Sequence, residues 1–123
     1  MSECCCGGKN VLFFSCSGAA NVAEVADLAA RKLTEEGAGM MWCLAGLGAG
    51  IPDMIQKAKD AGLNVVIDGC PMDCAKKIFD NAGITNYTQV KVTDLGIEKV
   101  KGVRATDEEV AQAVANVKEV LAQ

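Results

Sequence analysis

Asn64-Val65-Val66-Ile67-Asp68 is the stretch that decides the fold, because it is the clearest strand signal in the chain. Its short continuous apolar run is typical of a strand that is covered on both faces. Gly69-Cys70-Pro71 then turns the chain into a helix that carries Cys74 and is stopped by Gly83. A buried strand that leads straight into a helix is the repeating unit of a layered α/β protein.

Strands and helices alternate in the same way along the rest of the chain. Further strands are predicted at 11–14, 40–44 and 87–92, and further helices at 19–36, from Pro52 to about Gly62, and from Thr106 to 121. The glycine-rich segment 46–50 and residues 93–97 are expected to be loops. We therefore predict a single-domain α/β three-layer sandwich with a four-stranded parallel sheet, flavodoxin- or Rossmann-like, and a strand order such as 2-1-3-4. Residues 1–9 are predicted to be a flexible cysteine-rich lead, and residues 10–123 the single domain.

The composition excludes several classes of protein. The net charge is −4, with one Trp and one Tyr, so the chain lacks the basic surface and the stacking residues of a nucleic-acid binder. No apolar run approaches the roughly 20 residues of a membrane helix. The N-terminus also lacks the basic start and apolar stretch of a secretory signal. We therefore expect a cytoplasmic protein with reduced cysteines, bound to neither membrane nor nucleic acid.

The seven cysteines and the absence of histidine define the candidate chemistry. Without histidine the chain cannot use Ser-His-Asp or Cys-His catalysis, nor a zinc site that contains imidazole. Cys16 and Cys43 each close a predicted strand, Cys70 follows the third strand by two residues, and Cys74 lies four residues after Cys70. Because adjacent strands lie about 4.8 Å apart and parallel strands end at one edge, the four thiols are expected to converge. Four thiolates with Zn–S bonds of about 2.3 Å form a tetrahedral metal site.

Residues around the cysteines could support this site. Cys74 is expected in the first turn of its helix, where free N–H groups and the helix dipole stabilise a thiolate. Asp68 could orient the Cys70 loop by accepting backbone hydrogen bonds, or it could simply end a strand. Lys99, beyond the fourth strand, could stabilise thiolate charge, although a solvated surface lysine is the more common role.

The stretch Ile67-Asp68-Gly69-Cys70-Pro71-Met72-Asp73-Cys74-Ala75 resembles the motif of the DGC-domain family of bacteria and archaea. The resemblance continues in residues 16–19, 43–46 and 92–99, and so covers nearly the whole chain in order. It implies one Zn²⁺ ion bound by four cysteines, which fall on Cys16, Cys43, Cys70 and Cys74 in this sequence. No reaction is firmly attached to the family, so the resemblance implies metal binding alone, with a structural, metal-handling or sensing role.

Two other functions would use the same cysteines. A redox protein could hold an iron–sulfur cluster, which also takes four cysteines, or use thiol–disulfide chemistry, although Cys70 and Cys74 form C-x-x-x-C rather than C-x-x-C. An enzyme could use Cys16 or Cys70 as a nucleophile, activated by a helix N-terminus or a lysine. A closed site of four thiolates has no open position, which favours metal holding over catalysis. Cys4-Cys5-Cys6 is either an arm that captures metal or a terminus without function, and no protein partner is predicted.

Overall fold

Four parallel strands form the centre of the structure, a computed structural model that describes residues 10–123. They are β1 (Val11–Ser15), β2 (Met40–Met41), β3 (Leu63–Asp68) and β4 (Tyr87–Lys91). Their order is β2-β1-β3-β4, and every neighbouring pair is parallel. The predicted parallel sheet and strand order are therefore confirmed. The predicted lead, residues 1–9, lies outside the described residues.

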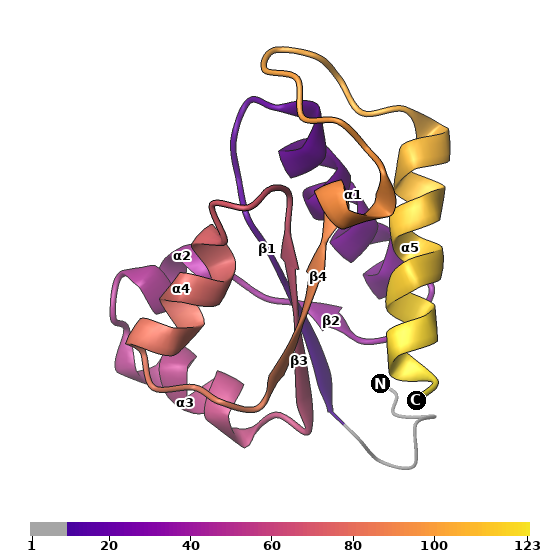
Figure 1. Ribbon diagram of the computed structural model, residues 1–123. Helices are drawn as coiled ribbons and strands as arrows, with labels where there is room; N and C mark the ends of the chain where they lie inside the picture. The colour runs from indigo at the N-terminus through magenta and orange to yellow at the C-terminus, as the bar shows by residue number, and fades with distance from the viewer. Residues whose placement is uncertain (1–9) are drawn as a thin grey trace.

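Helices cover both faces of the sheet, which confirms the predicted three-layer sandwich (Figure 1). Helices α1 (Asn21–Glu35) and α5 (Asp107–Leu121) lie together on one face. The other face is covered by α2 (Leu44–Gly48), α3 (Pro52–Asp60) and α4 (Cys74–Asn81). Within residues 10–123, no helix is long and apolar enough to cross a membrane.

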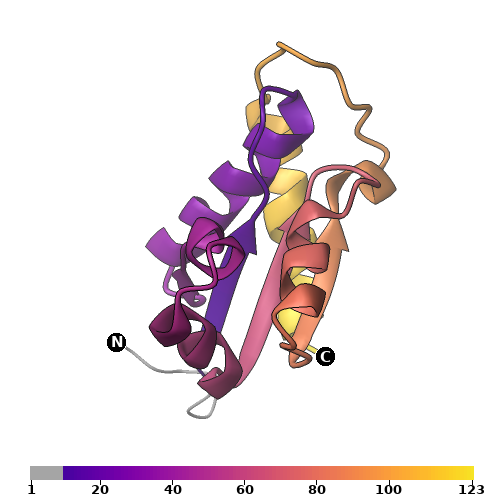
Figure 2. The ribbon, with the colours of Figure 1, turned by 90° about the vertical axis from the view of Figure 1, so that its left-hand side faces the viewer.

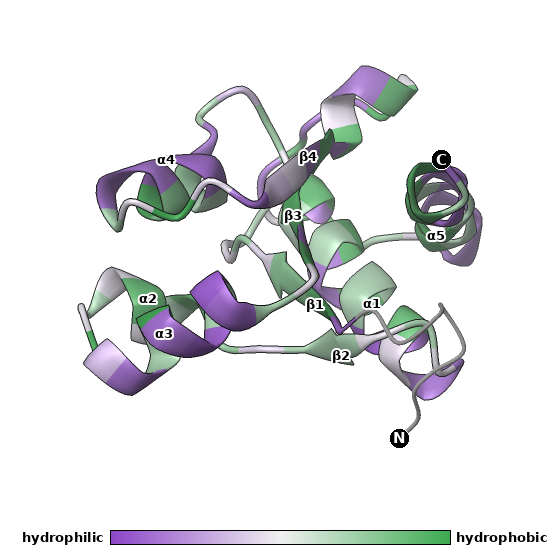
Figure 3. Cartoon of the chain, turned by 90° about the horizontal axis from the view of Figure 1, so that it is seen from below, coloured by the Kyte–Doolittle hydropathy of each residue, from purple (hydrophilic) through white to green (hydrophobic). Residues whose placement is uncertain are grey.

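Alternate residues of the central strands supply two separate cores, because successive side chains of a strand point to opposite faces. Phe13 and Ile67 pack with α1 and α5, whereas Phe14 and Val66 pack with α4. On that second face the rings of Phe14 and Phe79 meet edge to face, with centroids 4.9 Å apart. Seen from below, the helices turn hydrophobic sides toward the sheet and hydrophilic sides outward (Figure 3). Burial on both faces explains the continuous apolar runs of β1 and β3.

The second strand is shorter than predicted. It was expected over 40–44, but β2 ends at Met41, and one further ladder hydrogen bond joins the Trp42 N–H to Phe13 O at 2.8 Å. Residues from Leu44 onward leave the sheet and form α2. Cys43 is consequently the N-cap residue of a short helix and not the last residue of a strand.

The glycine-rich segment 46–50, expected as a loop, contributes most of α2. Glycine disfavours a helix by itself, so the reason lies in packing. A Cβ atom on Gly46 would stand 2.7 Å from the Met54 side chain of α3, which means that glycine permits close contact between α2 and α3. Leu47 is buried in the same contact region. Tertiary packing therefore overrides the local propensity.

Residues 98–105 cross the N-terminal end of α1, and we call this segment the strap. The Asn21 side chain accepts a hydrogen bond from Val100 N–H (2.7 Å) and donates one to the first carbonyl of the strap (2.9 Å). The Glu24 carboxylate accepts hydrogen bonds from the Arg104 side chain at 2.9–3.0 Å. In Figure 2 the strap arches over the end of the sheet at which the arrowheads of β1 and β4 point. The strap thus lies at the edge where the cysteines were expected.

Candidate functional site

A pocket of about 370 Å³ opens at the C-terminal ends of β1 and β3. These two strands flank the point where the chain reverses its direction across the sheet, which is where open α/β sheets bind ligands. Cys16, Cys70 and Cys74 all line this pocket. Cys43 does not line it and is exposed. The structure thus brings three of the four predicted ligands to one pocket. The fourth, Cys43, lies outside it, beyond the early end of β2.

Cys16 follows β1 directly and is buried at 9% exposure. Its backbone N–H continues the ladder by donating to Ile67 O at 3.1 Å. Its Sγ accepts a hydrogen bond from the Gly69 N–H, also at 3.1 Å. Burial raises the pKa of the Cys16 thiol to about 11, while the Gly69 hydrogen bond acts in the opposite direction. Cys16 is therefore a neutral thiol at neutral pH in the metal-free protein.

Asp68, the last residue of β3, caps the helix that carries Cys74. Its carboxylate accepts hydrogen bonds from the N–H groups of Ala75 (2.8 Å) and Lys76 (3.1 Å), and from the Gln89 side chain (2.9 Å). The local N-cap residue, Asp73, has a left-handed backbone (φ 56°) and makes no side-chain cap. Asp68 supplies the missing cap from seven residues away. Asp68 thus ends β3 and accepts backbone hydrogen bonds, but from α4 and not from the Cys70 loop that it was considered to orient.

Gly69 fits a space that no other residue could occupy without a backbone shift. A Cβ atom there would lie 2.9 Å from the carbonyl carbon of Val22 and 3.0 Å from the nitrogen of Ala23, both in α1. These neighbours are backbone atoms of a helix and cannot turn away. In this position the Gly69 N–H donates to Cys16, and Cys70, the next residue, lines the pocket.

Cys70 and Cys74 are joined by a tight turn. The Asp73 N–H donates to Cys70 O at 3.2 Å and closes the turn, with Pro71 inside it. Pro71 was expected near the first helical position, but α4 begins three residues later at Cys74. The expected place of Cys74 in the first turn is confirmed, and its side chain is exposed, whereas Cys70 is half-buried. The turn directs both thiols toward the same opening.

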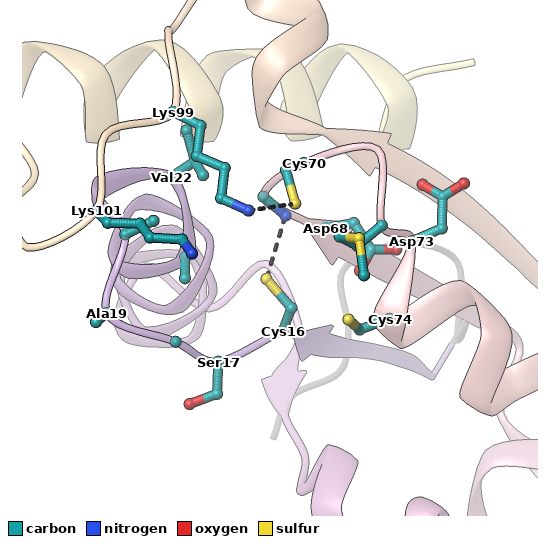
Figure 4. A pocket seen from close by; sticks show the side chains of 15 residues that line it. Cys16, Ser17, Ala19, Val22, Asp68, Cys70, Asp73, Cys74, Lys99 and Lys101 are labelled. Atoms are coloured by element: carbon teal, nitrogen blue, oxygen red, sulfur yellow. Dashed lines mark hydrogen bonds between the residues drawn. The ribbon is translucent and has the colours of Figure 1, made fainter.

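Two lysines of the strap complete the pocket (Figure 4). Lys99 is an exposed lysine, and its Nζ lies 3.4 Å from Cys70 Sγ. Lys101 lines the same pocket and was not singled out from the sequence. Its place beside Lys99 could have been inferred, because residues two apart in an extended segment point to the same side. The strap is extended enough for Lys101 to form a bridge with Ala20.

The chemistry of these side chains fits a thiophilic metal, but the thiols stand apart. All four cysteines among residues 10–123 are free, and no histidine competes with them. Within this same range, no three Cys, Asp or Glu side chains are grouped closely enough to hold a metal ion as they are placed. The pocket therefore offers three separate thiols, of which Cys16 is held by Gly69 and Cys70 by Lys99.

Comparison with known proteins adds an independent line of evidence. The model of the DGC domain family matches residues 12–117, a range that contains all four candidate cysteines and both pocket lysines. The chain is 29% identical over 91 residues to the anaerobic and virulence modulator AnvM of Pseudomonas aeruginosa, an alignment that covers 74% of this chain and 70% of the relative. No solved structure matches the chain.

Proposed function

Because the chain belongs to the DGC-domain family, we propose that it binds one Zn²⁺ ion through the thiolates of Cys16, Cys70 and Cys74. The observation that carries the proposal is the meeting of these three thiols in one pocket at the reversal point of the sheet. Thiolates are the preferred protein ligands of zinc when histidine is absent. Cys43, which begins α2 close to the same edge of the sheet, is the candidate for the fourth ligand.

Metal binding would change the pocket in two ways. The thiols must move closer together, since no three described ligand side chains are near enough to hold an ion. Cys16 must also lose its proton, because its pKa is about 11 in the metal-free protein. Metal binding is therefore coupled to proton release, and the affinity for zinc should fall as the pH falls. The Gly69 N–H and Lys99 would remain as donors to the sulfur atoms.

We propose a regulatory role for the bound ion in preference to a catalytic one. The relative AnvM is named as a modulator. With Cys43 as the fourth ligand, the site would be closed by protein thiolates and would offer no position for a substrate. The cytoplasm is the compartment that suits this proposal, because free thiols persist there in the reduced form.

The test is the metal content of protein that is purified without a metal-affinity tag. We expect about one zinc per chain in the native protein. Cys16→Ser, Cys70→Ser and Cys74→Ser should each lose most of it, and Cys43→Ser should lose it only if Cys43 is the fourth ligand. Cobalt substitution with visible spectroscopy would count the thiolates independently. Full zinc occupancy in Cys74→Ser would show that Cys74 is not a ligand. A brown protein with stoichiometric iron would show that the site holds an iron–sulfur cluster and not zinc.

A thiol-redox function is the second candidate, favoured by the contact between Lys99 and Cys70. A nearby ammonium group stabilises a thiolate, which is the reactive form in disulfide exchange. Two pocket thiols would lose two protons and two electrons to an external disulfide and form one bond between them. Metal-free protein that gains one intramolecular disulfide in a glutathione redox buffer would support this function, while protein that stays fully reduced would argue against it.

A further inference from the structure

We infer that the thiol pocket also contains a binding site for a phosphate-type oxyanion, formed by Lys99 and Lys101 of the strap. Both lysines line the pocket, and the carboxylates that share it are already occupied by donors. The inference does not depend on zinc, because it concerns the charge that the metal-free pocket presents to a ligand.

The strap delivers the two ammonium groups to one place. Lys99 and Lys101 are separated by the exposed Val100, so their side chains leave the extended segment on the same side. The antiparallel β-bridge between Ala20 and Lys101 and the Asn21 hydrogen bonds fix the strap at the N-terminal end of α1, beside the pocket. In Figure 4 both lysine side chains extend toward the space in front of the sulfur atoms.

The acidic groups in the pocket do not neutralise these lysines. Both Asp68 oxygens accept hydrogen bonds, from two N–H groups of α4 and from Gln89. Asp73 is bound by Gln89 and forms an ion pair with Lys91 at 3.1 Å. Among residues 10–123, neither Lys99 nor Lys101 forms an ion pair with a carboxylate. An incoming ligand therefore meets two positive charges that no carboxylate of residues 10–123 neutralises.

The size and remaining lining of the pocket fit a small anion. Its volume of about 370 Å³ is at the lower end of the range for small-molecule sites. The exposed segment 17–19 also lines the pocket, and its N–H groups donate to no backbone carbonyl of residues 10–123. Lysine ammonium groups together with free backbone N–H groups are a usual combination for phosphate. Alanine and valine side chains of α1 form the apolar wall beside them.

The experiment is a titration of metal-free, reduced protein with inorganic phosphate, followed by ³¹P NMR line width and calorimetry at constant ionic strength. A parallel titration uses phenyl phosphate, which distinguishes an organic phosphate from the free ion as the better ligand. The variants are Lys99→Gln and Lys101→Gln. The matched control is Lys59→Gln, which removes one charge from an exposed lysine of α3 near the start of β3.

We expect saturable binding of at least one of the two phosphates, weakened about three- to fivefold by each pocket variant, as for an exposed charge pair. Lys99→Arg should restore most of the loss, and the control should bind as the native chain does. Binding that is equal in the native, pocket and control proteins would overturn the inference, as would the absence of saturable binding to either phosphate. Failure here would leave zinc content unaffected, so the two proposals fail separately.

Discussion

Asp68→Asn is the change that most directly tests how the site is built. Asp68 is 1% exposed, and its carboxylate holds the N-terminal turn of α4 by accepting hydrogen bonds from Ala75, Lys76 and Gln89. Asparagine has nearly the same shape but only one acceptor oxygen. It could still accept from Ala75, while its NH₂ group would face the donors of Lys76 and Gln89. The substitution therefore removes two hydrogen bonds without creating a cavity.

The loss follows from the number and kind of these bonds. A hydrogen bond to a charged group contributes about 1.5–3 kcal/mol to the free energy of unfolding. Lys76 N–H is only partly buried, and water can replace part of its bond. We therefore take the lower limit for each bond and expect a loss of about 3 kcal/mol. The domain should remain folded, since small domains have a stability of about 5–15 kcal/mol.

Urea denaturation followed by far-UV circular dichroism measures this loss. The slope against urea concentration should stay the same, because the same surface is exposed on unfolding. Asp53→Asn is the control: Asp53 lies in the first turn of α3 but is exposed, and the change should cost less than about 1 kcal/mol. A loss in Asp68→Asn that does not exceed the loss in the control would refute the assignment of Asp68 as the cap of α4.

Two further predictions concern the residues on either side of the pocket. Gly69→Ala should destabilise the fold by about 1–3 kcal/mol, because its Cβ would press on the backbone of α1. Gly18→Ala is the control, since its Cβ would stand 3.7 Å from the nearest side-chain atom. The control should be close to neutral in the same denaturation assay. Equal effects of the two changes would contradict the close approach of Gly69. Because burial raises the pKa of Cys16 to about 11, its alkylation by iodoacetamide, mapped by mass spectrometry, should still increase about tenfold per pH unit up to about pH 10. A rate that levels off below about pH 9 would mean that Cys16 is not desolvated.

The parts of the fold that could be predicted from the sequence are those that local patterns control. The apolar runs of β1 and β3 mark strands buried on both faces, and the predicted start of the last helix at Thr106 agrees with the capping box that Thr106 and Glu109 form at α5. The alternation of strands with helices then leaves few possible topologies, and the predicted order was among them. The resemblance to the DGC-domain family agreed with the family-model match.

The remaining features depend on contacts that no local pattern encodes. Helix α2 forms in a glycine-rich segment where Gly46 packs against Met54, and β2 ends at Met41, before Cys43. The lysines of the strap reach the pocket from more than eighty residues after Cys16, through hydrogen bonds to Asn21. The sequence could therefore predict which edge of the sheet holds the thiols and suggest Lys99 near them, but not which thiols share a pocket or that Lys101 joins them.

The position of the pocket between β1 and β3 also sets how firmly its members are held. Each of these strands pairs on both sides, so its amide groups exchange with solvent only when much of the domain opens. Strand β2 has two residues and pairs on one side, and an edge of this kind frays at a much lower cost in free energy. We therefore expect Cys16, whose N–H continues the β1 ladder, to be held as long as the domain stays folded. Cys43 follows the short edge strand, and we expect it to be released by local opening of that strand.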